Sequence, residues 1–209
     1  MAPRTAGSPE SGQPTVSDEL ERWLSAEGPR TFGSLLELFG QKSFALVFVL
    51  LLGVPALPLP TGGATHVFEI IAVVLAFQLI VGREKIWLPR RWRRLDLAGP
   101  RQQRFLHALI RMIRLLERFS RPRARFLFGH RLSNAVFGTL VVGGSVAAFV
   151  APPFTGLDTL PALGVVLLSL GVLLEDIAVV LVALVVAAAG IALEIVLGTA
   201  AINGVGSLF

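Results

Sequence analysis

The sequence predicts an all-α, polytopic helical membrane protein, with two hydrophobic hairpins that are each broken by proline and glycine and together form an internal repeat. Of its 209 residues, 54% are apolar and only 16% are charged, and the mean hydropathy is +0.72. A soluble domain of this size would leave large apolar patches exposed. The long apolar runs do not alternate in polarity, so helices and not barrel strands are expected to satisfy the backbone in lipid.

Two breaks, at residues 54–63 and 151–161, lie about ninety residues apart, and a Thr-Gly pair occupies the same point in each. Breaks at corresponding positions of two halves predict discontinuous helices around a membrane-embedded site. Two helix N-termini there would attract an anion such as the head group of a lipid-linked sugar. The alternative is a pair of ordinary turns between transmembrane helices. The residues predicted to bind substrate are Pro60, Thr61, Gly62, Gly63, Thr155, Gly156 and Asp158.

The first break also bears on how deeply its hairpin enters the membrane. The apolar run at residues 44–54 reaches only about 17 Å, short of a ~30 Å hydrocarbon core, whereas residues 64–81 reach about 27 Å. Prolines 55, 58 and 60 cannot continue a lipid-facing helix. We therefore favour a re-entrant first hairpin over a full hairpin with an irregular first leg.

The chain divides into seven segments by composition. These are a disordered tail (1–16), amphipathic helices at the cytoplasmic membrane surface (17–42), the first hydrophobic hairpin (43–82), a basic cytoplasmic loop (83–131), the second hydrophobic hairpin (132–175), a final transmembrane helix (176–199) and a C-terminal tail (200–209). In the second hairpin, Gly138, Gly143 and Gly144 predict close helix packing.

Charge is concentrated in the basic loop, which contains fifteen of the 19 Arg and Lys residues and only three acidic residues. Such a loop beside membrane spans stays in the cytoplasm, which predicts a cytoplasmic N-terminus in a bacterial inner membrane. Within the loop, residues 101–118 predict a basic amphipathic helix against anionic lipid, because Arg111 and Arg114 interrupt its apolar stretch. Nucleic-acid binding is the competing interpretation, and we do not expect it beside so many membrane segments.

Three acids stand out within the apolar runs. Glu69 lies three residues after His66 on the same helix face and is interpreted either as a proton relay or as a dipole-stabilised acid near the interface. Asp158 invites the same choice, with helix capping as its simpler role. Glu194 is either a buried partner for an arginine or a residue near the outer surface.

Four other polar residues are expected to be structural. Gln78 predicts an interhelical hydrogen bond, and Arg83 marks the exit to water. Glu175 and Asp176 indicate a solvated turn, or alternatively a contact with the arginine-rich loop. We find no nucleophile-base pair, phosphate-binding loop, metal-ligand cluster or cysteine, and therefore expect no enzyme activity, no cofactor and no metal.

Several short motifs resemble the ExoD family of bacterial membrane proteins of exopolysaccharide synthesis, over residues 31–197. They are Pro58-Leu-Pro60-Thr-Gly62, Phe77-Gln-Leu-Ile-Val-Gly-Arg83 followed by Trp87-Leu-Pro89, and Pro153-Phe-Thr-Gly156 through Leu160-Pro161 to Leu174-Glu-Asp176. The resemblance implies an inner-membrane protein needed for exopolysaccharide production, and it supplies no catalytic residues.

Two functions follow as hypotheses. The first is a transporter or flippase-like factor for a lipid-linked or anionic substrate, coupled to protons through Glu69, His66 or Asp158 and working as a homodimer. The second is a membrane scaffold that positions polysaccharide-synthesis proteins through the basic loop, above all through Arg90, Arg91, Arg93 and Arg94. The expected partners are membrane lipid, a lipid-linked sugar or other anion, and polysaccharide-synthesis proteins, with no nucleic acid.

Overall fold

The structure, a computed structural model, describes residues 14–57, 65–83, 85–120, 130–151 and 157–206. Within these residues the regular secondary structure is helical and no β-strand is found, which confirms the all-α prediction. The helices are α1 (Val16–Ser25), α2 (Phe32–Phe39), α3 (Ser43–Leu52), α4 (Thr65–Ile80), α5 (Arg90–Arg93), α6 (Pro100–Phe119), α7 (Arg131–Val150), α8 (Thr159–Leu174) and α9 (Ile177–Gly206), with a 3-10 turn at Gly40–Lys42. The last helix thus continues beyond residue 199, where it was expected to end.

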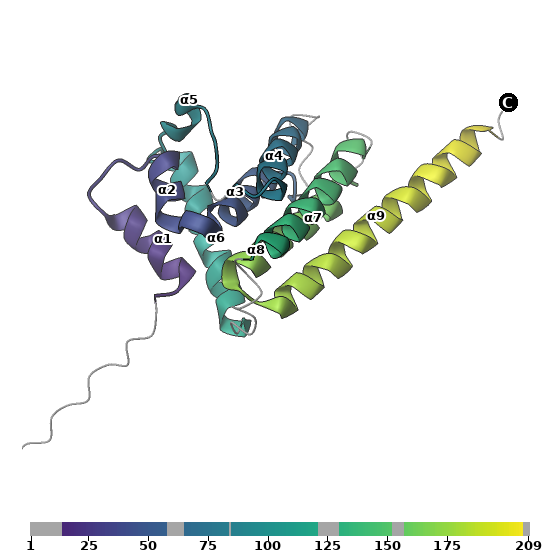
Figure 1. The fold of residues 1–209 in the computed structure, drawn as a ribbon. Coiled ribbons are helices and arrows are strands. Elements are labelled where there is room, and N and C mark those ends of the chain that lie inside the picture. Colours follow the sequence, from purple (N-terminus) through teal and green to yellow (C-terminus); the bar gives the residue numbers. More distant parts are fainter. Residues whose placement is uncertain (1–13, 58–64, 84, 121–129, 152–156, 207–209) are drawn as a thin grey trace, which may run out of the picture.

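Helices α1, α2, α5 and α6 gather on one side of the other five helices (Figure 1). Helices α1, α2 and α6 each turn an apolar face into the protein, where Leu20, Leu35 and Ile113 are fully buried. Helix α1 is held against α6 by Glu117, whose carboxylate accepts hydrogen bonds from the Ser17 backbone N–H, at 3.0 Å, and from the Ser17 hydroxyl. The faces that we expected to lie on a membrane surface are therefore covered by protein.

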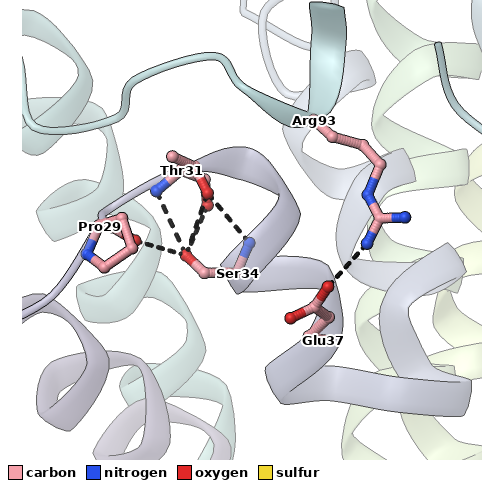
Figure 2. Close-up of polar contacts among 5 residues, drawn as sticks. All are labelled: Pro29, Thr31, Ser34, Glu37 and Arg93. Carbon is pink, nitrogen blue, oxygen red and sulfur yellow. Dashed lines mark hydrogen bonds and ion pairs between the residues drawn. The ribbon is translucent and has the colours of Figure 1, made fainter. Parts of the chain in front are cut away.

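Capping residues fix where α1 and α2 begin. Thr15 and Asp18 form a capping box, in which each side chain accepts a hydrogen bond from the other residue's backbone N–H. Thr31 and Ser34 repeat this arrangement at the start of α2, as Figure 2 shows. The two boxes satisfy backbone donors that a helix N-terminus otherwise leaves free.

The basic segment around α5 is tied to α2. Arg93 donates to Glu37 at 2.7 Å (Figure 2), and the backbone of Thr31 pairs with that of Asp96 in an isolated antiparallel bridge. Two backbone hydrogen bonds complete this pairing, from Phe32 to Leu95 at 2.9 Å and from Leu97 to Arg30 at 2.8 Å. The segment is thus part of the folded unit and not a free loop.

Helix α3 lies at the centre of the molecule. Eight of its ten residues are buried, among them Phe44, Phe48 and Leu52. It packs chiefly against α8 and also against α4, and the Phe48 ring meets Phe137 of α7 edge-on at 5.7 Å. The first apolar run is therefore shielded from any surrounding lipid by the other helices.

Glycines allow the long helices to approach closely. A Cβ on Gly138 of α7 would lie 2.8 Å from the Ile80 side chain of α4, and one on Gly164 of α8 would lie 2.6 Å from Ala187 of α9. Gly144 is likewise closed in by Val165, so the predicted packing role is confirmed for Gly138 and Gly144. It is wrong for Gly143, whose Cβ position has no neighbour within 4 Å.

The outer surface of the bundle is strongly apolar. On α4, exposed side chains recur every three or four residues along one face, at Val67, Ile70, Val74 and Phe77. By length and composition, Arg131–Val150 and Ile177–Ala200 are able to cross a membrane. Helix α4, which we expected to span over residues 64–81, has 16 residues, or about 24 Å, and is shorter than a hydrocarbon core. These features indicate membrane association.

The turn between α8 and α9 is not the solvated turn that we expected. Asp176 is 2% exposed, and its carboxylate accepts the Ala178 N–H at 2.8 Å at the start of α9. Glu175 has a left-handed backbone, with φ of 56°, and forms an ion pair with Lys42 at 3.0 Å. Glu175 therefore contacts the residue just before α3, and the alternative pairing with the arginine-rich loop stays a prediction.

Candidate functional site

A buried histidine-carboxylate pair lies in the first turns of α4. His66 Nδ1 lies 2.8 Å from Glu69 Oε2, as expected for residues three apart on one helix face. The Glu69 side chain is fully buried, whereas His66 is 26% exposed. The second oxygen of Glu69, Oε1, is also buried and has no hydrogen-bond partner among the described residues. A buried carboxylate oxygen without a donor is costly, which makes this pair a candidate for function.

The packing of α4 against α7 places a further polar group beside this pair. The two helices are antiparallel, since Gly138 contacts Ile80 whereas the Phe149 ring meets the His66 ring at 5.0 Å. Ser145 lies two turns after Gly138 on the same face of α7, which sets it level with Glu69. The Ser145 side chain is fully buried, and its hydroxyl has no hydrogen-bond partner in the described part of the chain.

The packing of α8 against α9 adds two more carboxylates. Gly190 of α9 contacts Leu160 and Pro161 of α8, and Gly164 contacts Ala187, so these helices are antiparallel as well. Glu194, one turn beyond Gly190, therefore lies level with the residues just before α8.

Asp158 connects the two helix pairs. Its carboxylate interacts electrostatically with Glu69 on one side and with Glu194 on the other. Asp158 occupies the N-cap position of α8, yet its side chain makes no capping hydrogen bond, so the capping role that we preferred is wrong.

We call these five residues the polar layer: His66, Glu69, Ser145, Asp158 and Glu194. The Glu69 carboxylate is fully buried among apolar helices, and a buried ionised carboxylate is costly unless a proton or a cation compensates its charge. His66 supplies one positive charge when protonated. No group of three or more His, Cys, Asp or Glu in the described residues has the geometry of a metal site.

The remaining predicted residues have structural roles or lie elsewhere. Gln78 does not bridge two helices as expected: its side chain binds the backbone of Trp87, accepting from N–H at 2.9 Å and donating to C=O at 3.2 Å. Arg83 is exposed beyond the end of α4, as expected for an exit to water. Six of the predicted substrate-binding residues lie outside the described residues: Pro60, Thr61, Gly62, Gly63, Thr155 and Gly156.

Two parts of the polar layer were not assigned to it from the sequence. Glu194 is half-buried, and its described electrostatic partner is Asp158 and not an arginine, while a position near the outer surface stays a prediction. Ser145 carries no sequence signal, because serine is unremarkable in a glycine-rich apolar helix. Only the register of α7 against α4 places Ser145 within about one helix turn of the level of Glu69.

Comparison with known proteins identifies the family. The family model described as "Exopolysaccharide synthesis, ExoD" matches residues 16–196. "Uncharacterized protein slr1875" of Synechocystis sp. (strain ATCC 27184 / PCC 6803 / Kazusa) is 29% identical over 164 residues, 77% of this chain and 76% of that protein. "Protein ExoD" of Rhizobium meliloti (strain 1021) is 27% identical over 168 residues, 78% of this chain and 69% of that protein. No solved structure matches significantly. The chain belongs to the ExoD family of exopolysaccharide synthesis.

Proposed function

We propose that this chain is a proton-coupled, flippase-like transporter that moves a lipid-linked or otherwise anionic intermediate of exopolysaccharide synthesis or export. The observation that carries the proposal is the polar layer, in which a fully buried Glu69 pairs with His66 and keeps one oxygen without a partner among the described residues. Ionisable groups inside apolar helices are costly and mark ion or proton pathways. The proposal includes no chemical change to the substrate.

The proposal divides the work between two parts of the protein. The polar layer is acidic and therefore takes up and releases protons, while it repels an anion whenever its carboxylates are ionised. Anion binding is assigned to the two proline- and glycine-rich breaks, which flank the starts of α4 and α8. Proton release from the layer would change the electrostatic field at the N-termini of α4 and α8. Proton movement would in this way be coupled to binding and release of the anion.

The proposed setting is the bacterial inner membrane, with several passes and with the N-terminus and the basic loop in the cytoplasm. The apolar outer surfaces of α4, α7 and α9 support this placement, as does the excess of Arg and Lys in the loop. The proposed transporter is a homodimer, because the few helices of one protomer are too small a set to enclose a transport path.

Neutral variants of the layer test the proposal. Glu69→Gln and Asp158→Asn keep the side-chain size but cannot release a proton, so each is expected to abolish polysaccharide output in cells that lack the native protein. Glu27→Gln is the matched control, since Glu27 is an exposed acid between α1 and α2, outside the layer, and forms no ion pair among the described residues. Protein level in the membrane is measured in parallel. Full output from Glu69→Gln at normal protein level would reject the proton-coupled mechanism.

The alternative is a scaffold without transport, and one observation favours it. The basic segment is fixed to α2 and presents the exposed side chains of Arg90, Arg91 and Arg94, while Arg93 is paired with Glu37. A fixed basic surface suits an acidic protein partner. Under this alternative, Arg90→Gln, Arg91→Gln and Arg94→Gln together lower output more than the Glu69 variant does, and a synthesis protein no longer co-purifies.

A further inference from the structure

The outer face of α6 carries an open groove of about 500 Å³, a size that suits a small ligand or a lipid head group. Ala108, Met112 and Leu115 give it an apolar floor, and its other lining residues are Arg111, Arg114 and Arg118. No acidic side chain is among the described residues that line it. The groove is therefore both basic and apolar.

The groove is separate from the face by which α6 joins the protein. That inner face consists of Leu106, Leu109, Ile110 and Ile113, all buried. On the outer side, by contrast, Leu115 is 55% exposed and Phe119, one turn further on, is 79% exposed. The exposed apolar side chains of Met112, Leu115 and Phe119 thus form a second stripe, distinct from the buried face, and this stripe is free to meet a ligand.

Two of the three arginines are available. Arg114 forms an ion pair with Glu21 of α1, which takes up its charge. Arg111 and Arg118 form no ion pair within the described residues, and they lie seven residues apart, on the same side of the helix. Two open guanidinium groups beside an exposed apolar stripe match a molecule that joins an anion to hydrocarbon.

We propose that this groove binds an acidic phospholipid, with the phosphate held by Arg111 and Arg118 and the upper acyl chain lying along Met112, Leu115 and Phe119. Charge complementarity selects the acidic head group, and the exposed apolar stripe selects a lipid over a free phosphate. The binding site would hold the α1-α6 pair against the membrane surface. It is independent of the proton-coupled function proposed above.

The test uses the full chain purified in a neutral detergent, with bound lipid counted by native mass spectrometry. Phosphatidylglycerol is added in one series and phosphatidylcholine in another, and glycerol phosphate, which has the charge without the chains, is added as a competitor. Wild type is expected to retain phosphatidylglycerol and not phosphatidylcholine, and glycerol phosphate is not expected to displace the bound lipid.

The double variant Arg111→Gln, Arg118→Gln is expected to weaken phosphatidylglycerol binding by roughly thirtyfold, since each arginine near an acidic membrane surface contributes about fivefold. Arg101→Gln, Arg104→Gln is the matched control, because both residues are exposed on the same helix and neither lines the groove. Leu115→Ser tests the apolar stripe and is expected to weaken binding as well.

Three results would overturn the proposal. Equal losses in the two double variants would mean a diffuse attraction to basic charge. Unchanged binding in the Arg111, Arg118 variant would mean that the groove does not hold the lipid and leaves an acidic protein as its occupant. Displacement by glycerol phosphate would identify an anion site with no role for the acyl chains.

Discussion

Two buried serines provide a matched test of the polar layer. Ser145 on α7 and Ser169 on α8 are both fully buried. The Ser169 hydroxyl donates to the Val165 carbonyl at 2.8 Å, whereas the Ser145 hydroxyl has no partner in the described residues. The same change, serine to alanine, is therefore expected to have opposite effects on stability at the two positions.

The magnitudes follow from the hydrogen bonds. A buried hydroxyl without a partner costs about 1–3 kcal/mol, and Ser145→Ala removes that cost, so we expect a gain of about 1 kcal/mol after the lost packing of one atom. Ser169→Ala removes a satisfied hydrogen bond and is expected to cost about 1 kcal/mol. The difference of about 2 kcal/mol is roughly thirtyfold in the equilibrium constant for unfolding.

The assay is unfolding of the purified chain from mixed micelles by increasing denaturing detergent, followed by tryptophan fluorescence from the three native tryptophans. Polysaccharide output is measured for the same variants. Ser145→Ala is expected to be more stable and less active, because the open hydroxyl serves the layer and not the fold. A loss of stability in Ser145→Ala comparable to that in Ser169→Ala would show that the hydroxyl is a structural hydrogen-bond donor, and the polar layer would lose one member.

Two further predictions concern the fold. Thr15→Ala removes the cap of α1 and is expected to lower stability by about 1 kcal/mol. Hydrogen bonds from Thr15 hold the pKa of Asp18 below its usual range. The stabilisation from ionised Asp18 is thus present above about pH 4 and is lost as the pH falls through the lowered pKa. The difference in unfolding free energy between wild type and Asp18→Asn is therefore expected to shrink on acidification. A difference that grows would contradict the capping box. On the helix pair α8-α9, Gly164→Ala places a methyl group 2.7 Å from the Ala187 Cα and is expected to cost about 1–3 kcal/mol. Gly143→Ala, where the space is open, is the control, and its unfolding free energy is expected to rise by up to about 1 kcal/mol in unfolding titrations of the same kind. Equal effects at the two glycines would refute the close packing.

The helices could be predicted from the sequence because their signals are local. The apolar runs, the charged ends and capping residues such as Thr31 are read within a few residues, and they give helices close to those observed. The pairing of His66 with Glu69 was equally local, because both residues lie on one helix turn. Such patterns do not show what an apolar helix face packs against. The apolar faces of α1 and α2 were therefore assigned to lipid, although they pack against protein.

The rest of the site depends on contacts between distant parts of the chain. Asp158 looked like a cap because it precedes a helix, whereas its electrostatic interactions with Glu69 and Glu194 involve residues far away in the sequence. Lys42 and Glu175 are more than a hundred residues apart, and no pattern in the sequence joins them. Side-chain bonds to a neighbouring backbone, such as that of Gln78 to Trp87, are also determined by the path of the chain after a helix and not by the helix itself.

The bridge between Thr31 and Asp96 limits how the chain is threaded through a bilayer. Two residues joined by backbone hydrogen bonds must share one side of the membrane, so the chain between them makes an even number of crossings, whether that number is zero or two. The ion pair between Lys42 and Glu175 likewise requires an even number of membrane crossings along the longer path through α3, α4, α7 and α8. Within the described residues, no backbone bridge or ion pair of this kind ties the far end of α9. We expect α9, which is long and apolar enough to cross a membrane, to be the helix whose two ends lie on opposite sides.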